Sequence, residues 1–181
     1  MPSSISGAKR IPRVLLPAAA LALVVALSAT ASASARPAYR VVNDSSDRAL
    51  MPKNGSNAWG ATIVQENRAP VVSQMWYLER VRFTNTWRFR NRQSNLCIHP
   101  SDWSGLNGSH LLQATCSNGS EARWYRYDLA PTPKWRFQSV RTYKFMDIAG
   151  GSSAAGADAI QNDEYAVDPS QRWLLEYAGD F

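Results

Sequence analysis

Internal repetition at a spacing of about 48 residues constrains this chain more than any other feature of its sequence. Each unit opens on an aromatic residue followed by arginine, and each closes on a tryptophan. The recurring positions are Tyr39, Trp87 and Trp135; Leu50, Ile98 and Met146; Gly60, Gly108 and Gly156; Gln65, Gln113 and Gln161; and Trp76, Trp124 and Trp173. Units this short cannot bury a hydrophobic face alone, so the three must share one core.

Alternating side chains within each unit predict β-strands. The segments Trp87–Arg90 and Trp135–Gln138 place aromatic residues on one face and polar residues on the other, as a half-buried strand requires. Turn-rich stretches such as Pro52–Asn57 separate these segments, and the repeats show no sustained helical period. We therefore predict an all-β fold, with the closing tryptophans in the core and the recurring glycines in turns that need positive φ or a close approach of the backbone.

The first 35 residues have the pattern of a bacterial secretory signal peptide. Basic residues precede the apolar run Val14–Leu27, and a stretch of small residues ends at Ala35. A membrane span needs about 20 apolar residues, whereas this run has 14 and contains Pro17. We expect cleavage after Ala35, with Ala33 as the second candidate, and therefore a secreted, extracellular protein.

The part that follows the predicted signal peptide, residues 36–181, has the size of one domain. Its three repeats span about 37–84, 85–132 and 133–181. Three of the 20 basic residues fall in the signal peptide, which leaves 17 against 14 acidic residues. This excess is too small to argue for a nucleic-acid partner by itself, and we expect none.

Arginine is concentrated in one short region, at Arg80, Arg82, Arg88, Arg90 and Arg92. The simpler interpretation is the solvent face of two successive strands. The alternative is a patch for anionic glycans.

Several motifs resemble the ricin-type lectin family, whose fold is the β-trefoil. They are the Gln-x-Trp triplets Gln74–Trp76 and Gln171–Trp173, the strand Asn95–Ile98, the segment Met146–Ser153 and the segment Gly156–Gln161. The resemblance extends over nearly all of the repeats. It implies a β-trefoil of three tandem repeats and a carbohydrate ligand.

The two cysteines, Cys97 and Cys116, occupy the place of an intra-repeat disulfide in this family. An even pair in an exported protein favours a bridge. The alternative is a metal site formed by both cysteines with His99 and His110, but an oxidising compartment disfavours free thiolates. We therefore expect a disulfide and neither a metal nor a cofactor.

The resemblance also implies one shallow sugar pocket for each unit. An aspartate after the cysteine-bearing strand accepts hydrogen bonds from the sugar, an aromatic ring stacks on it, and a polar pair before the closing tryptophan completes the contacts. In the third unit these positions hold Asp147, Gln161 and the pair Ser170–Gln171. Asn162 stands where an aromatic residue is usual, so that stacking falls to Tyr165.

The other two units depart further from this pattern. The middle unit has His99 at the aspartate position, Glu121–Ala122 as its pair and Trp103 on the loop; the first has Met51 at the aspartate position. We rank the third pocket first, the middle pocket second and the first pocket last. The alternative is structural: Asp147 would stabilise a turn, and Gln161 and Gln171 would be buried hydrogen-bonding partners, which is the role we favour for the two glutamines.

The sequence contains no Gly-x-Ser-x-Gly or His-Glu-x-x-His motif, so we expect no catalysis. The predicted function is that of a secreted, monomeric carbohydrate-binding protein with no membrane attachment after signal cleavage. The alternative is a trefoil that has lost sugar binding and acts as a protein-interaction module or a protease inhibitor.

Overall fold

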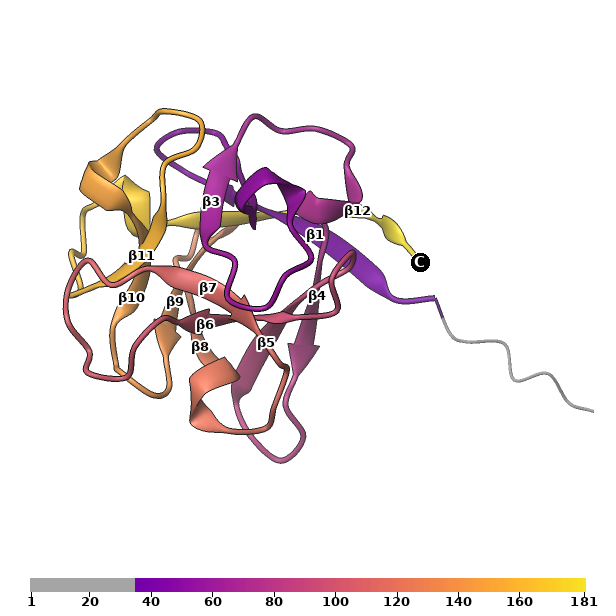
Figure 1. Ribbon diagram of the computed structural model, residues 1–181. Helices are drawn as coiled ribbons and strands as arrows, with labels where there is room; N and C mark the ends of the chain where they lie inside the picture. The colour runs from indigo at the N-terminus through magenta and orange to yellow at the C-terminus, as the bar shows by residue number, and fades with distance from the viewer. Residues whose placement is uncertain (1–34) are drawn as a thin grey trace, which may run out of the picture. The chain divides into compact units, whose positions relative to one another are not determined.

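The computed structural model describes residues 35–181, and the predicted signal peptide lies outside the described residues except for Ala35. Twelve strands make up this part (Figure 1). They are β1 (Pro37–Asn43), β2 (Ala49–Pro52), β3 (Ile63–Glu66), β4 (Trp76–Arg80), β5 (Thr86–Asn91), β6 (Cys97–Pro100), β7 (Leu111–Ala114), β8 (Trp124–Asp128), β9 (Lys134–Ser139), β10 (Phe145–Ile148), β11 (Ala159–Asn162) and β12 (Trp173–Asp180).

Five short 3-10 turns lie between these strands: η1 (Lys53–Gly55), η2 (Val72–Gln74), η3 (Ser120–Ala122), η4 (Ala149–Gly151) and η5 (Pro169–Gln171). Within residues 35–181 no helix is long and apolar enough to cross a membrane. The all-β prediction is therefore confirmed for the described part of the chain.

Six strands close into a barrel. Strand β1 pairs with β12 and β4, β4 with β5, β5 with β8, β8 with β9, and β9 with β12, all antiparallel. The other six form the hairpins β2–β3, β6–β7 and β10–β11. Single bridges join the hairpins to one another, for example Thr62 with Leu112 and His110 with Ile160. This arrangement is a β-trefoil, as predicted.

The three closing tryptophans, Trp76, Trp124 and Trp173, are fully buried in the shared core. Each indole Nε1 donates to a backbone carbonyl of the preceding hairpin, at 3.0 Å to Leu50, 3.2 Å to Ile98 and 3.2 Å to Met146. A buried indole needs such a partner for its N–H. The prediction of core tryptophans is confirmed, and each one also attaches a barrel strand to a hairpin.

Two further sets of recurring residues have structural roles. Gly60, Gly108 and Gly156 have φ values of +81°, +82° and +80°, a region that L side chains rarely adopt, so the predicted positive φ is confirmed. The glutamines connect the units: Gln65 Nε2 donates to Ser152 O at 2.7 Å, and Gln113 Nε2 donates to Ser56 O at 2.7 Å.

Candidate functional site

Met51, His99 and Asp147 occupy the same place in the three hairpins. Each is the third residue of its strand, β2, β6 or β10. The 3-10 turn that precedes each closing tryptophan packs against that strand: η2 on β2, η3 on β6 and η5 on β10. We call the three sites the first, middle and third pockets.

In the third pocket the Asp147 carboxylate is 2 % exposed and accepts four hydrogen bonds. Oδ1 accepts from Ile148 N and from Ser170 Oγ, both at 2.6 Å. Oδ2 accepts from Gln171 Nε2 at 3.0 Å and from half-buried Asn162 Nδ2 at 3.2 Å. A buried carboxylate requires this many donors because it has lost its water. The protein itself therefore uses the four acceptor positions of Asp147.

The remaining residues predicted for the third pocket are divided by the fold. Gln171 is fully buried; its Oε1 accepts from the backbone of Tyr165 at 2.9 Å, and the side chain of Tyr165 is 47 % exposed. Gln161 is also fully buried, but it accepts from Thr142 Oγ1 at 2.7 Å and donates to Leu106 O at 3.3 Å. Asp147, Asn162 and Gln171 are thus in direct contact, while the Gln161 amide joins two units as Gln65 and Gln113 do.

The middle pocket holds a buried nitrogen with no partner. His99 is 6 % exposed, and its Nε2 has no hydrogen-bond partner among the described residues. Burial lowers the pKa of His99, although nearby Glu121 and a hydrogen bond to the Thr115 backbone act in the opposite direction. The imidazole is therefore neutral at pH 7. Because Nε2 is unpartnered, we assign the Thr115 bond to Nδ1–H, which makes Nε2 the acceptor.

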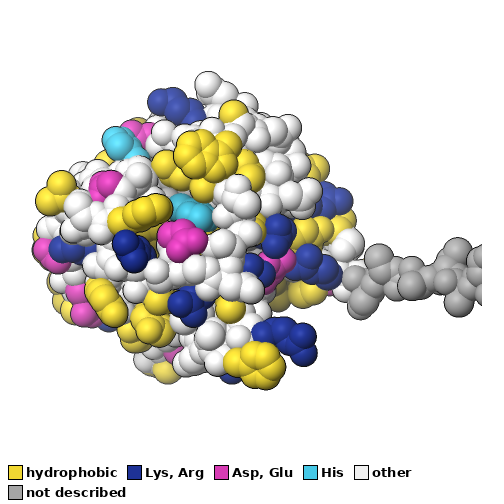
Figure 2. All heavy atoms as spheres, turned by 60° about the horizontal axis from the view of Figure 1, so that its bottom comes forward, with side chains coloured by type: hydrophobic (Ala, Val, Ile, Leu, Met, Phe, Trp, Pro, Cys, Tyr) yellow, Lys and Arg dark blue, Asp and Glu magenta, His cyan; other side chains and the backbone are white. Residues whose placement is uncertain are grey.

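Around His99 lie charged and aromatic groups from two units. A hydrogen bond from Ser117 lowers the pKa of the Glu121 carboxyl, and His99 and Arg141 lower it further. Trp103 is 63 % exposed, with the Arg141 guanidinium 5.3 Å from its ring centre. Figure 2 shows a face on which a histidine, acidic, basic and hydrophobic side chains lie close together. Arg141 belongs to the third unit, so the sequence pattern of the middle unit could not predict that Arg141 lies at this pocket.

The disulfide confirmed between Cys97 and Cys116 holds the middle pocket together. The two Cα atoms are 4.9 Å apart. Cys97 lies two residues before His99 on β6, and Cys116 lies on the loop that leads to Glu121. The bridge therefore joins the two segments that carry the polar groups of this pocket, and neither cysteine is free to bind a metal.

The first pocket has no polar acceptor at this position. Gln74 Nε2 reaches the Met51 sulfur at 3.7 Å, which is a weak contact. The Gln74 amide also accepts from Ala69 N at 2.8 Å and donates to Asn67 O at 2.7 Å. Gln74 thus repeats the backbone contacts of Gln171, which supports a structural role for both glutamines. Trp59 of the first unit is exposed, but an aromatic ring alone does not orient a sugar.

Comparison with protein families gives one match. The model of the ricin-type beta-trefoil lectin domain-like family matches residues 72–162, which is half of the chain. A search of curated protein sequences found no match.

Many solved structures are similar. A designed three-fold symmetric protein, ThreeFoil, has a TM-score of 0.72 at 24 % identity, with 77 % of this chain and 97 % of that one covered. An exo-beta-1,3-galactanase from Clostridium thermocellum has a TM-score of 0.73 at 26 % identity, over 81 % of this chain but 31 % of the enzyme. A ricin B-like lectin from Macrolepiota procera, in complex with lactose, has a TM-score of 0.66 at 15 % identity over 80 % of this chain and 98 % of the lectin.

Proposed function

The chain belongs to the ricin-type beta-trefoil lectin domain-like family, and we propose that it is a secreted carbohydrate-binding protein that performs no catalysis. One observation carries the proposal: the middle pocket contains a buried polar atom, His99 Nε2, without a partner in the described part of the chain. Buried polar atoms are nearly always hydrogen-bonded, so we take this unpartnered atom as the place where a ligand donor binds.

The middle pocket offers complementary groups for a pyranose. Once the atoms that cover His99 Nε2 move aside, a sugar hydroxyl donates to it, and a second hydroxyl donates to the Glu121 carboxylate, which is ionised at neutral pH. The exposed ring of Trp103 supplies a flat apolar surface for the sugar face. The disulfide holds the two segments in place, which reduces the ordering cost of binding.

The third pocket is a secondary site in this proposal. All four acceptor positions of Asp147 already have donors, so a sugar hydroxyl must replace one of them. Asn162 is the donor to replace, because its bond is the longest and its side chain is the only half-buried one of the four. Tyr165 then lies nearby as the stacking ring.

A single shallow pocket of this kind corresponds to millimolar affinity, about 4 kcal/mol. Two pockets that bind one repeating polysaccharide bind it more tightly by avidity.

The non-catalytic role is supported by the kinds of protein that share the fold. Lectins are among them, and the galactanase is covered over only 31 % of its length. The lactose in the Macrolepiota lectin identifies a ligand of that protein.

The test is a glycan and polysaccharide screen of the protein, followed by titration of each hit with His99→Phe and Asp147→Asn variants. We expect His99→Phe to weaken binding at least tenfold and Asp147→Asn to weaken it much less. His110→Gln is the matched control, because it changes the other histidine of the chain.

Loss of binding in Asp147→Asn alone would move the site to the third pocket. If no glycan binds at millimolar concentration, the lectin proposal fails and a protein partner becomes the better explanation.

A further inference from the structure

The five arginines that are close together in the sequence are divided by the fold into two groups. Arg88 Nη2 and Arg90 Nε pair with Glu79 at 3.0 and 2.9 Å, and Arg36 also pairs with it. Burial raises the pKa of Glu79, but hydrogen bonds from Arg90 and Arg36 more than offset this effect and hold it below the usual value. Arg92 lies over the Phe181 ring at 3.6 Å. These arginines are engaged within the protein.

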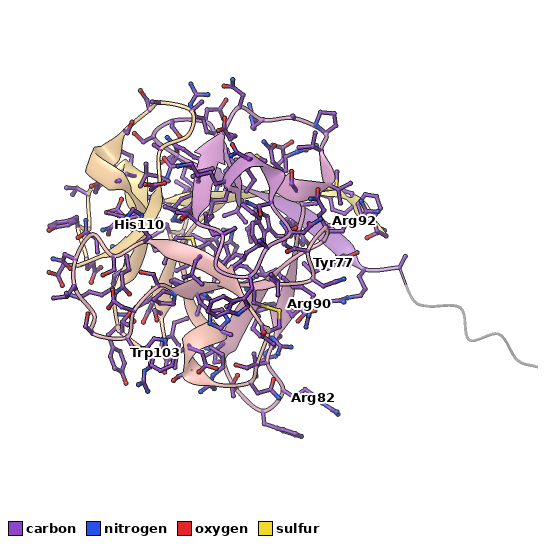
Figure 3. The ribbon with its side chains drawn as sticks, viewed as in Figure 1. Tyr77, Arg82, Arg90, Arg92, Trp103 and His110 are labelled. Atoms are coloured by element: carbon purple, nitrogen blue, oxygen red, sulfur yellow. A yellow bond between two sulfur atoms is a disulfide. The ribbon has the colours of Figure 1, made fainter. Side chains whose placement is uncertain are left out.

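The second group has no acidic partner. Arg80, at the end of β4, and Arg82, on the following turn, have no carboxylate oxygen within 4.0 Å among residues 35–181. The same holds for a further arginine outside the five, Arg123, which follows η3. Figure 3 shows Arg82 protruding from the turn, apart from Arg90 and Arg92. Together with Arg88 and Asn118, the three residues line a hollow of about 500 Å³. We call it the arginine hollow.

An aromatic residue stands at the rim of the arginine hollow. Phe83 is 100 % exposed and has a φ of +60°, a conformation that is unfavourable for a bulky residue. Its one aromatic contact is with the Arg82 guanidinium, 5.6 Å from the ring centre. Folding therefore gains almost nothing from this ring, while the backbone conformation that presents it costs energy. Strain at an exposed aromatic residue points to a contact outside the chain.

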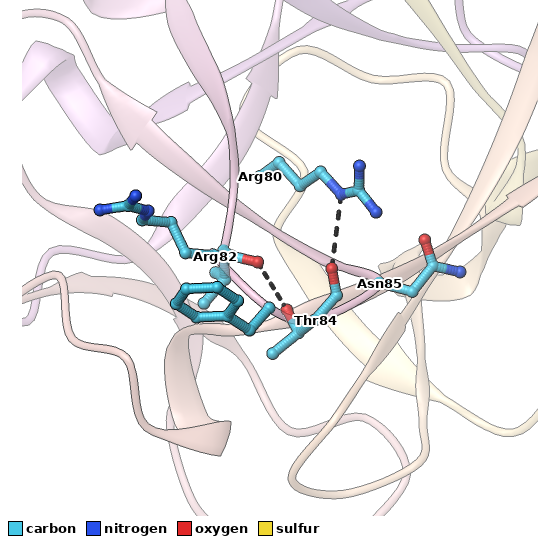
Figure 4. Close-up of a pocket in the computed structure, with 6 residues that line it drawn as sticks. Arg80, Arg82, Thr84 and Asn85 are labelled. Atoms are coloured by element: carbon cyan, nitrogen blue, oxygen red, sulfur yellow. Dashed lines mark hydrogen bonds between the residues drawn. The ribbon is translucent and has the colours of Figure 1, made fainter.

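The turn that carries Phe83 is held in a defined shape. Arg80 Nε donates to Thr84 O at 3.4 Å, and Thr84 Oγ1 donates to Val81 O at 2.9 Å (Figure 4). The fold does not require these residue types, because the equivalent turn of the middle unit, 48 residues later, has Asp128, Ala130 and Pro131 in place of Arg80, Arg82 and Phe83. The cluster is thus specific to one turn.

We propose that the arginine hollow binds an acidic polysaccharide, separately from the middle and third pockets. Its carboxylate or sulfate groups pair with Arg80, Arg82 and Arg123, whose guanidinium groups suit bidentate contacts with such anions. One sugar ring packs on Phe83. The hollow is concave, which suits a flexible polyanionic chain better than a flat lipid surface. The inference rests on the proposed function in taking a glycan as the ligand, but not on the residues of the other pockets.

The test measures binding of the protein to polygalacturonate and to dextran sulfate, with neutral dextran as the reference, at 50 and 300 mM NaCl. We expect binding to both acidic polymers at low salt and at least tenfold weaker binding at high salt, because screening weakens exposed charge pairs. The double variant Arg80→Gln/Arg82→Gln should weaken binding at least tenfold, and Phe83→Ser about threefold.

The matched control is Arg48→Gln/Arg68→Gln, which removes the same charge from arginines outside the hollow. An equal loss in this control would overturn the proposal, because net charge would then explain binding. Binding to phosphatidylglycerol vesicles in place of the polymers would also overturn it. His99→Phe separates the two sites: retained polygalacturonate binding in this variant supports the arginine hollow whatever happens to the middle pocket.

Discussion

The middle and third pockets occupy the same place in two copies of one structural unit, but they differ in what their polar groups are doing. In the third pocket the expected acidic residue is present, and its oxygens accept four bonds from the protein. In the middle pocket the acidic residue is replaced, yet the substituting His99 keeps a nitrogen with no partner in residues 35–181. The residue type at a site is therefore a weaker indicator of binding than the hydrogen-bonding capacity that folding leaves unused.

The two pockets are also stabilised by different means. The network around Asp147 joins β10, β11 and η5 by hydrogen bonds, so the same groups that would contact a sugar also support the fold. The middle pocket has a disulfide for this purpose. A covalent bond between the segments leaves their polar side chains available for a ligand. The comparison predicts that the middle pocket can lose its binding groups at little cost in stability, whereas the third cannot.

The largest expected effect follows from removal of the disulfide. Cys97→Ala/Cys116→Ala should lower the free energy of unfolding by about 3 kcal/mol, because the open loop regains conformational freedom in the unfolded chain. Sugar binding at the middle pocket should fall as well, since β6 and the Glu121 segment are no longer joined. Urea unfolding and sugar titration measure the two effects. Unchanged sugar affinity would show that the bridge does not organise the pocket.

Removal of the third-pocket carboxylate should have the next largest effect. Asp147→Ala removes the acceptor of four hydrogen bonds, although Ser170 Oγ keeps Asp168 Oδ1 as a partner, and we expect a loss of about 2 kcal/mol in unfolding free energy. The companion variant is Asp147→Met, which places in the third pocket the residue type that the first pocket holds at this position, Met51. Urea unfolding provides the measurement. A loss below about 0.5 kcal/mol in both variants would contradict the structural role of this network.

Substitution of His99 should lower sugar affinity strongly and stability only slightly, the opposite of what we expect for Asp147. His99→Phe keeps a ring in the same volume and removes the acceptor, so sugar affinity should fall at least tenfold while the unfolding free energy changes by less than about 1 kcal/mol. Calorimetric titration and urea unfolding on the same samples check both values. A large loss of stability with no loss of affinity would reverse the roles that we assign to the two pockets.

Acidification should weaken the middle pocket. Because the pKa of His99 in the folded protein lies below its ordinary value of 6.5, the unfolded chain takes up this proton first as the pH falls. The stability due to the neutral imidazole is fully present above about pH 6.5 and is lost as the pH falls towards the lowered pKa. Protonation of the folded protein also turns Nε2 into a donor, so sugar affinity falls as the pH passes through the lowered pKa of His99.

Unfolding and sugar titrations at pH 7.5 and 5.5 measure this dependence. His99→Phe should abolish the part of the pH dependence that comes from His99, and His110→Gln should retain this part. An identical pH profile in the wild-type protein and in His99→Phe would exclude His99 as its origin.

The smallest expected effect concerns the third pocket. Asn162→Ala removes the donor with the longest bond to Asp147 and opens one position at Oδ2. We expect a severalfold gain in sugar affinity at this pocket, about 1 kcal/mol or less, with a stability loss of similar size. Chemical-shift perturbation around Asp147 and Tyr165 during sugar titration reports on this site. No perturbation there in the variant would show that the pocket is purely structural.

Much of the fold could be predicted because its determinants are local and recur. The tryptophan spacing placed Trp76 and its counterparts in one core, and this prediction is confirmed. The glycine positions indicated turns that need positive φ or a close backbone approach, and Gly60 and its counterparts have positive φ. The cysteine pair was predicted from the family resemblance and is a disulfide. The structural interpretation of Gln161 and Gln171 agrees with the contacts that their amides make.

The availability of each polar group was decided only by the tertiary structure. The sequence placed Arg88 and Arg82 in one cluster, but Glu79 neutralises the first and leaves the second without an acidic partner. It placed Asp147 in a sugar pocket, but Asn162 and Gln171 occupy its oxygens. Repetition determines which backbone positions are equivalent, because strand pairing and core packing depend on local pattern. Hydrogen bonds and ion pairs form between segments far apart in the chain, and only the folded arrangement determines which groups remain for a ligand.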